Sequence, residues 1–204
     1  MTLASKLTMG RVVCIPFFIF FLFFAGAWGK LLALLIFAFA SFSDFLDGWF
    51  ARRRGEVTTM GKIVDPVADK ILIYGAFISF IQLQLIPFWM VIIIMGRDFL
   101  IMGLRVELAA KKIILSASKL AKLKTFFEDI AVFFILFALV LEGFGVRIWA
   151  WGTEFIDSSG AIYRTFGVRI WTWEEITYLL IGIATLLALV SGVQYWLENR
   201  RYLG

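Results

Sequence analysis

The chain has 204 residues, of which 62% are hydrophobic, and its mean hydropathy is +0.92. A water-soluble domain keeps much of its surface polar, so this composition excludes an ordinary soluble protein and indicates a membrane protein. The net charge of +5 would suit nucleic acid or anionic lipid. The basic residues lie beside apolar segments and not in a separate basic domain, which argues against nucleic acid.

Six apolar segments are long enough to cross a bilayer, because a helical span takes about 20 residues. They cover roughly residues 7–27, 30–52, 64–86, 88–108, 126–143 and 176–197. We therefore expect an all-α integral membrane protein with six transmembrane helices, formed as a single polytopic domain over residues 1–204.

Basic residues are divided unevenly between the two ends of these spans. With the N-terminus in the cytoplasm, 16 of the 20 Lys and Arg residues fall on the inner side. The outer side keeps Lys30, Arg147, Arg164 and Arg169. The positive-inside rule therefore predicts that both termini face the cytoplasm.

The first predicted span carries Arg11 near its start, and residues 26–30 are expected to form the outer turn that follows it. A long basic side chain near the end of a span can anchor the helix by reaching the headgroup region. It can equally line a site for a lipid headgroup. The residues alone leave both interpretations of Arg11 open.

The segment 44–70 concentrates acidic residues in this apolar chain. Its aspartates and several small or basic residues recur with the spacing of a helix. Acids next to a membrane span are costly and usually face a cavity or a functional site. Residues three, four, seven and eight apart share one face of a helix. One such set is Asp44, Asp47, Gly48, Ala51 and Arg52, and the other is Gly61, Asp65 and Asp69.

Two helices that carry these sets would point four carboxylates into one space, where like charges repel unless protons or cations compensate. A hard divalent cation prefers oxygen ligands, so we expect a Mg²⁺ or Mn²⁺ site with one or two ions. The chain has no His and only Cys14, which argues against zinc, copper or iron. The alternative is that the acids are solvated or pair with neighbouring basic residues. Pro66 disfavours helical geometry at Asp65, so a helix should start or kink there.

The complete pattern D-x-x-D-G-x-x-A-R, eight residues, then G-x-x-x-D-x-x-x-D resembles the signature of the CDP-alcohol phosphotransferase family. All eight fixed positions match. The flanking stretches LTMGRVVCIP, DPVADK, GRDFLIMGLR and KLKT resemble the branch of that family that makes phosphatidylglycerophosphate. The resemblance covers about residues 6 to 126 and is specific, because the eight residues stand at fixed spacing.

The resemblance implies transfer of the phosphatidyl group from CDP-diacylglycerol to glycerol 3-phosphate, at the cytoplasmic face of a bacterial inner membrane. It implies that two Mg²⁺ or Mn²⁺ ions bind to Asp44, Asp47, Asp65 and Asp69, and that Asp69 is also the general base. It places the CDP portion beside Gly48, Ala51, Arg52 and Gly61. It assigns the acceptor phosphate to Arg97, Arg105, Lys122 and Lys124, with Arg11 assisting.

Two departures from the family pattern bear on the acceptor. Ala121 stands where Gly often precedes the K-x-K-T run, and Val106 stands where Glu often follows the second arginine. Inositol phosphate, phosphatidylglycerol, serine or an aminoalcohol therefore remain alternative acceptors. A cation transporter is a further alternative, but it needs acids along a path through the membrane. The third and fourth spans offer only Gln82 and Gln84 toward the outer face.

Residues 144–175 form a long outer segment in which FGVRIWAW returns as FGVRIWTW. Aromatic residues favour the membrane interface, so we expect an aromatic hairpin that lies there. The segment is not part of the family signature. The Gly- and Phe-rich helix surfaces would permit a homodimer.

Overall fold

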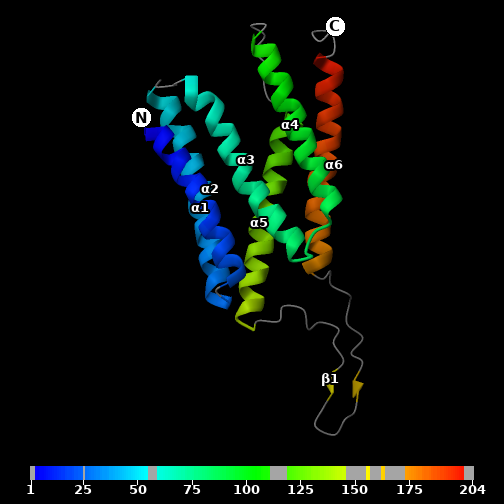
Figure 1. The fold of residues 1–204 in the computed structure, drawn as a ribbon. Helices are drawn as coiled ribbons and strands as arrows, with labels where there is room; N and C mark the ends of the chain where they lie inside the picture. Colours follow the sequence, from blue (N-terminus) through cyan, green and yellow to red (C-terminus); the bar gives the residue numbers. More distant parts are fainter. Residues whose placement is uncertain are drawn as a thin grey trace.

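The computed structural model describes residues 3–24, 26–54, 59–110, 119–145, 155–156, 162–163 and 173–199. These residues form six α-helices and one two-stranded antiparallel sheet (Figure 1). The elements are α1 (Leu3–Phe24), α2 (Gly26–Arg54), α3 (Thr59–Gln82), α4 (Phe88–Ala110), α5 (Lys119–Gly143), β1 (Phe155–Ile156), β2 (Ile162–Tyr163) and α6 (Trp173–Asn199). The predicted helical architecture with six helices is confirmed.

The turn between α1 and α2 is shorter than the apolar pattern suggests. The expected turn over residues 26–30 is wrong, because α1 ends at Phe24 and α2 already begins at Gly26. Gly26 has a φ of +58°, in the left-handed region that glycine adopts without a Cβ penalty, so the chain can reverse there at once. A second short turn joins α3, which ends at Gln82, to α4, which begins at Phe88.

The helices pack so that segments distant in sequence meet. α1 lies along α2 and against α3, α5 packs between α2 and α6, and α4 packs along α6. Both termini lie at the upper end of the bundle in Figure 1, together with the end of α2 and the start of α3. The two segments that carry the acidic signature therefore meet at the same end as the termini.

Aromatic side chains fill the centre of the bundle. Phe18 of α1 and Phe37 of α2 are fully buried, with ring centroids 6.1 Å apart. The ring of Phe133 on α5 meets Phe37 edge-on at 5.2 Å. Offset and edge-to-face contacts are the favourable geometries for aromatic pairs. Phe18, Phe37 and Phe133, which we call the aromatic row, therefore hold α1, α2 and α5 together.

Large apolar side chains also cover the outside of the bundle, while several charged side chains lie inside. More than half of the surface of each of the following is exposed: Phe17, Phe20, Phe39, Ile78, Ile92, Leu100, Phe137 and Leu186. Asp98, Lys124 and Glu128 are buried. This reversal of the soluble pattern is what a lipid environment selects.

Within the part of the chain that the structure describes, two helices contain apolar stretches long enough to cross a bilayer, Gly26–Ser43 in α2 and Glu175–Glu198 in α6. Shorter apolar stretches occur at Val13–Phe24 and Lys70–Gln82. Together with the apolar exterior, they mark the chain as a membrane protein.

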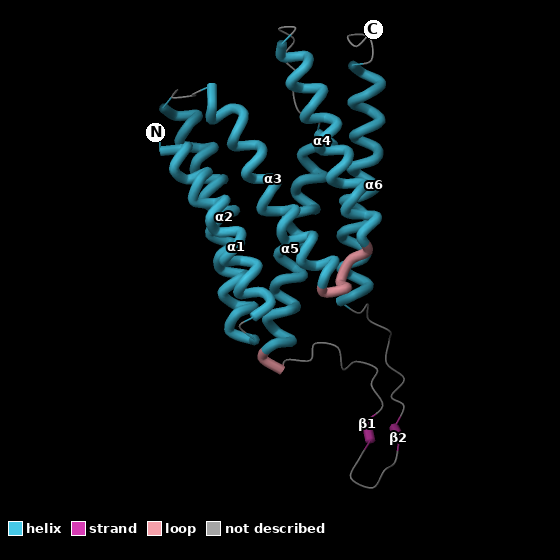
Figure 2. The backbone as a smooth tube through the Cα atoms, viewed as in Figure 1, coloured by secondary structure: helices cyan, strands magenta, loops and turns pink. Residues whose placement is uncertain are grey.

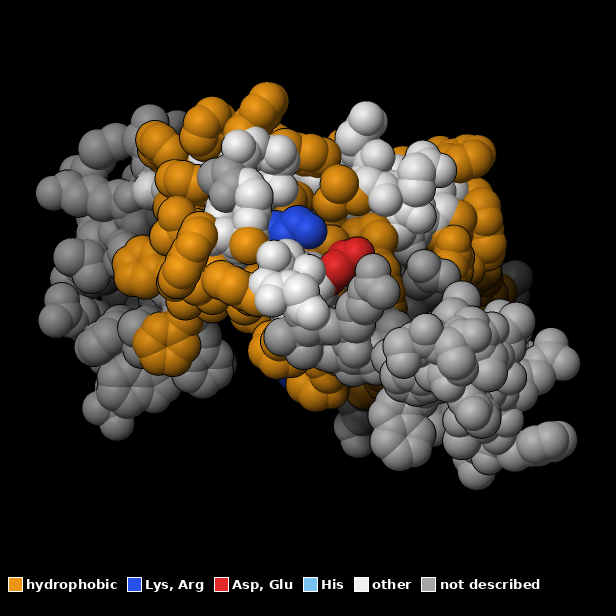
Figure 3. Space-filling view, turned by 90° about the horizontal axis from the view of Figure 1, so that it is seen from below, with side chains coloured by type: hydrophobic (Ala, Val, Ile, Leu, Met, Phe, Trp, Pro, Cys, Tyr) orange, Lys and Arg blue, Asp and Glu red, His pale blue; other side chains and the backbone are white. Residues whose placement is uncertain are grey.

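The end of the bundle opposite the termini displays mainly apolar side chains among those described (Figure 3). Trp28 and Phe144 meet edge-on there at 5.1 Å, and both are exposed. Phe88 and Trp89 are exposed at the start of α4. Aromatic residues gather where a bilayer meets water, so this end has the character of a membrane interface.

The predicted aromatic hairpin is described only in its middle. β1 and β2 lie beyond the lower ends of α5 and α6 (Figure 2) and pair Phe155 with Tyr163 and Ile156 with Ile162. These strands come from the stretch between the two aromatic repeats. The repeats themselves, apart from residues 144–145 and 173, lie outside the described residues.

Candidate active site

The eight signature residues all fall on helical backbone at the end of the bundle that holds the termini. The set from Asp44 to Arg52 occupies the last turns of α2, and the set from Gly61 to Asp69 occupies the first turns of α3. Their side chains, and that of Arg11, lie outside the described residues. The metal, CDP and base assignments therefore stay predictions.

The backbone decides one question that the sequence leaves open. α3 begins at Thr59 and continues without interruption to Gln82, so the helix does not start at Asp65. Asp65 and Asp69 lie one turn apart on a single helix, as the spacing predicts.

Just below this end of the bundle, three helices bring charged side chains to one point. We call this group the ionic cluster: Lys70 of α3, Arg97 and Asp98 of α4, and Lys124 and Glu128 of α5. Lys70 directly follows Asp69 in the chain, so the cluster adjoins the predicted metal site.

Asp98 is the centre of the ionic cluster, because its carboxylate meets donors from three helices. The Lys124 Nζ donates to both of its oxygens at 2.7 Å, and the Lys70 Nζ lies 2.6 Å from Oδ2. The Arg97 guanidinium donates to Oδ1 at 2.9 Å, and the Tyr74 hydroxyl donates to Oδ2 at 2.8 Å. Charge-assisted hydrogen bonds of this kind are the strong ones, so Asp98 fixes α3, α4 and α5 relative to one another.

Glu128 completes the pairing on α5. Its Oε1 lies 2.5 Å from the Lys124 Nζ, and its Oε2 lies 3.8 Å from the Lys70 Nζ. The side chains of both Lys124 and Glu128 are fully buried. Moving an ion out of water costs several kcal/mol even after the protein relaxes, so these charges are tolerable only as a paired set.

The side chain of Arg97 packs against α6. One guanidinium nitrogen of Arg97 donates to the hydroxyl of Ser191 at 2.9 Å, and Ser191 is fully buried. A Cβ at Gly192 would come within 3.1 Å of the Arg97 Cγ, closer than most such contacts. The glycine thus lets the stem of Arg97 lie directly against α6.

Arg105 and Lys122 are placed differently from Arg97 and Lys124. Both are exposed, and neither contacts the carboxylates of the ionic cluster. The Arg105 guanidinium lies 5.9 Å from the centre of the Tyr195 ring, within the range of a cation–π contact. The four basic residues predicted to bind phosphate thus divide into a paired set, with Lys124 buried and Arg97 partly buried, and an exposed set.

Sequence reasoning missed the roles of Asp98, Glu128, Lys70, Tyr74 and Ser191. One signal was readable, because Lys124 and Glu128 stand four residues apart and face the same side of a helix. The meeting of Lys70, Asp98 and Lys124 depends on how three helices cross, which local spacing does not reveal.

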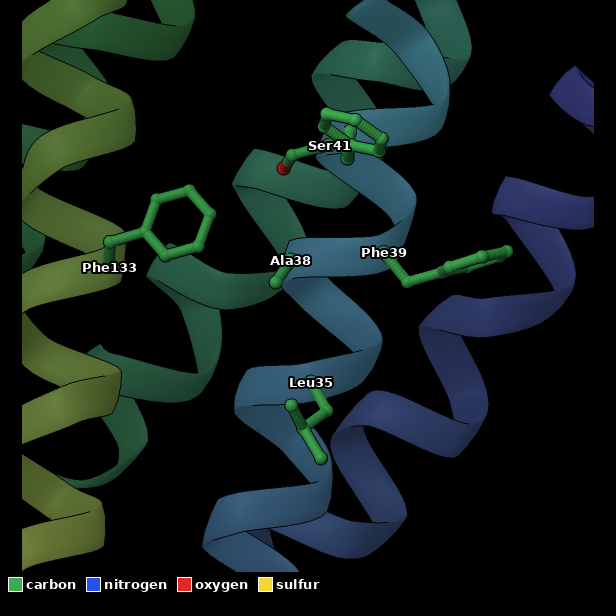
Figure 4. Close-up of a pocket in the computed structure, with 6 residues that line it drawn as sticks. Leu35, Ala38, Phe39, Ser41 and Phe133 are labelled. Atoms are coloured by element: carbon green, nitrogen blue, oxygen red, sulfur yellow. The ribbon is translucent and has the colours of Figure 1, made fainter. Parts of the chain in front are cut away.

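An apolar groove opens on the bundle surface between α2 and α5. We call it the α2–α5 groove, and its volume is about 790 Å³. Its lining consists of Leu35, Ala38, Phe39, Ser41, Phe42 and Phe133. Phe133 points from α5 toward α2 (Figure 4), and the α2 residues stand on the turns that lead to Asp44.

Comparison with known proteins places these features in a family. The sequence model described as CDP-alcohol phosphatidyltransferase matches residues 1–157, more than half of the chain. The chain belongs to the CDP-alcohol phosphatidyltransferase family. The resemblance inferred from the signature is thereby confirmed, and as a family member the chain is a transferase. α6, against which Arg97 packs, lies beyond the matched residues.

Individual relatives of this family are similar over most of their length. CDP-diacylglycerol–glycerol-3-phosphate 3-phosphatidyltransferase of Bacillus subtilis is 37% identical over 142 residues, 64% of this chain and 74% of that protein. The Rickettsia felis protein of the same name is 32% identical over 200 residues, covering 98% and 96%. A probable phosphatidylglycerophosphate synthase of Mycobacterium tuberculosis is 38% identical over 144 residues, covering 69% and 68%.

Proposed function

We propose that the chain transfers the phosphatidyl group of CDP-diacylglycerol to glycerol 3-phosphate, giving phosphatidylglycerophosphate and CMP. The observation that carries this proposal is the complete eight-residue signature, which occupies the adjoining ends of α2 and α3 in a member of this family. The names of the relatives from B. subtilis and R. felis support glycerol 3-phosphate as the acceptor. The R. felis similarity spans nearly the whole of both chains, so the support extends beyond the signature.

The donor set of the signature suits a hard divalent cation. It offers four carboxylates and no nitrogen or sulfur ligand, and oxygen ligands are what Mg²⁺ and Mn²⁺ prefer. The helical backbone of α2 and α3 puts each pair of aspartates on one helix face. We assign two ions, Mg²⁺ or Mn²⁺, to Asp44, Asp47, Asp65 and Asp69. Bound divalent ions neutralise pyrophosphate charge and stabilise a leaving phosphate.

In the reaction, Asp69 accepts the proton of the attacking hydroxyl as that oxygen bonds to the phosphorus of the phosphatidyl group. The bond from this phosphorus to the CMP oxygen breaks, and CMP leaves with the electron pair. A carboxylate beside cations is a weak base, so the effect of Asp69 depends on its lying within hydrogen-bond reach of the hydroxyl. The CDP portion lies beside Gly48, Ala51, Arg52 and Gly61, whose three small members leave room for it.

The phosphate of the acceptor meets the basic residues of α4 and α5. Arg105 and Lys122 are exposed and meet it first, and Arg97 and Lys124 supply positive charge from the ionic cluster, with Arg11 assisting from α1. Guanidinium groups suit phosphate because they donate two parallel hydrogen bonds.

The α2–α5 groove takes an acyl chain of CDP-diacylglycerol. Its lining is almost wholly apolar, it opens on the outer surface of the bundle, and its α2 residues lead toward the signature. A lipid whose headgroup is held at Asp44 and Asp47 can therefore lay one chain along α2 without leaving the bilayer.

The six helices cross the membrane as a single domain over residues 1–204, with both termini and the signature at the cytoplasmic face of a bacterial inner membrane. The strongly basic end of the bundle supports this orientation. The outer hairpin over residues 144–175 then rests at the opposite interface. A homodimer is compatible with the apolar exterior.

The test is CMP release by the purified protein in detergent, with CDP-diacylglycerol, Mg²⁺ and glycerol 3-phosphate. Glycerol, inositol phosphate and serine serve as alternative acceptors, and Asp69→Asn serves as the inactive control. We expect release that requires glycerol 3-phosphate and falls at least about a hundredfold in Asp69→Asn.

Release with a different acceptor would overturn the substrate assignment while keeping the reaction type. No release with any acceptor, by folded protein supplied with metal, would overturn the proposal itself. Replacing Mg²⁺ by Mn²⁺, and removing both with a chelator, tests the metal assignment in the same assay.

A further inference from the structure

The ionic cluster gathers cations from three helices beside the predicted metal site. Among the described side chains, it consists of three cations, Lys70, Arg97 and Lys124, and two carboxylates, Asp98 and Glu128. Cationic side chains gathered in a poorly hydrated site attract a phosphate monoester, because charges interact more strongly there than in water.

Exposure within the cluster is graded. The Lys70 side chain is 25% exposed, that of Arg97 12% and that of Asp98 5%, while Lys124 and Glu128 are fully buried. Within the ionic cluster, a water-soluble acceptor that has passed Arg105 and Lys122 therefore reaches Lys70 first. Lys70 is also the residue that follows Asp69, so it stands where the predicted metal site and the cluster adjoin.

The cations come from different helices and share one anchor. Lys70 from α3, Arg97 from α4 and Lys124 from α5 all lie within 2.9 Å of an Asp98 oxygen. Long basic side chains have many rotamers, and ordering each one on binding costs free energy. A carboxylate that already holds them removes this cost from the binding step.

We propose that Asp98 is a positioning residue for the acceptor: it gathers Lys70, Arg97 and Lys124 into a prearranged phosphate-recognition site, with Lys70 as the contact on the exposed side. This inference rests on the proposed function, since it concerns how glycerol 3-phosphate is held. It adds Lys70 to the residues that touch the acceptor and gives Asp98 a role through those cations.

The experiment measures initial rates of CMP release while each substrate is varied in turn. In Asp98→Asn we expect the KM for glycerol 3-phosphate to rise at least about tenfold, with the KM for CDP-diacylglycerol unchanged within about twofold. Asp98→Glu keeps the charge, so it should recover part of the loss. Glu142→Gln is the matched control, because it removes a carboxylate from the far end of α5, outside the ionic cluster.

Lys70→Gln should also raise the KM for glycerol 3-phosphate. In the double variant Lys70→Gln/Asp98→Asn, the rise in the KM for glycerol 3-phosphate should be smaller than the product of the rises in the two single variants. Both changes disrupt the same arrangement of side chains. The double variant also removes one charge of each sign, so it provides the test where Asp98→Asn alone does not fold.

If the wild-type protein does not use glycerol 3-phosphate, the proposed function is overturned, and this inference is overturned with it. With active wild-type protein, the positioning role is overturned by an unchanged KM for glycerol 3-phosphate in Asp98→Asn. It is equally overturned if the KM values of both substrates rise together without rescue by Asp98→Glu, which would mark a purely structural ion pair. Multiplicative effects of Lys70→Gln and Asp98→Asn would also overturn it.

Discussion

Two buried regions of the bundle share α5 and hold their helices together by different physics. On one side, the rings of Phe18, Phe37 and Phe133 join α1, α2 and α5. On the other, the ionic cluster joins α3, α4 and α5 through Asp98. Both regions exclude solvent from their centres, as Phe37 and Lys124 are each fully buried.

The difference lies in what each region loses when one partner is removed. Lipid tails are as apolar as the helices, so the aromatic row gains little from the hydrophobic effect and depends on close packing. Its energy is spread over many weak contacts. The ionic cluster concentrates its energy in a few pairs, and each pair is tolerable only while its partner is present.

This comparison predicts that Lys124→Met is the most damaging single change. It leaves Asp98 and Glu128 buried with one fewer cation, and breaking a buried pair costs about 3–5 kcal/mol. We expect the free energy of unfolding in detergent to fall by this amount, measured by denaturant titration.

Lys122→Met is the matched control for that change. Lys122 lies two residues away on the same helix, but it is exposed and outside the ionic cluster. Its substitution should leave the unfolding midpoint unchanged. Equal loss in the two variants would mean that the cluster contributes no particular stability, and the contrast with the aromatic row would fail.

The apolar side of the comparison can be tested through the α2–α5 groove. Ala38→Trp fills space beside Phe133, where we place an acyl chain. We expect kcat/KM for long-chain CDP-diacylglycerol to fall about tenfold, since a displaced chain loses its packing contacts. The rate with a short-chain analogue should change much less.

Leu186→Trp on the exposed side of α6 serves as the control, because it adds a similar ring at a surface away from the groove. It should leave the rates with both lipids unaltered. A loss that is the same for long and short chains in Ala38→Trp would show that the groove does not hold an acyl chain.

The sequence predicted well what depends on local pattern. Apolar runs predicted six helices, and the signature predicted the family, because both are recorded in the spacing of residues along one segment. The start of α5 was expected near residue 126, yet α5 begins at Lys119. The polar run before Phe126 hid this, since Lys124 is a charged residue that the fold buries.

The sequence could not predict which side chains from different helices contact one another. The family resemblance implied that Lys124 binds the acceptor phosphate, and that stays a prediction. Sequence reasoning did not foresee the observed partners of Lys124, which are Asp98 from α4 and Glu128 from its own helix. Asp98 stands beside Arg97 in the sequence and gives no sign there that Lys70 and Tyr74 will reach it. Such long-range pairing depends on helix crossings that no single segment encodes.

The smallest effect is expected in the aromatic row itself. Phe37→Leu removes ring contacts with Phe18 and Phe133 but leaves an apolar side chain that neighbouring groups can approach. Because unfolding within detergent exposes Phe37 to another apolar medium, the loss is mainly packing, and we expect about 1 kcal/mol. Equilibrium unfolding of Phe37→Leu and Lys124→Met under the same conditions measures the contrast directly, with CMP release expected to stay near normal in Phe37→Leu. If Phe37→Leu lowered the free energy of unfolding as much as Lys124→Met does, ring packing would be as intolerant of change as the buried charges. The two regions would then not differ in how they stabilise the bundle.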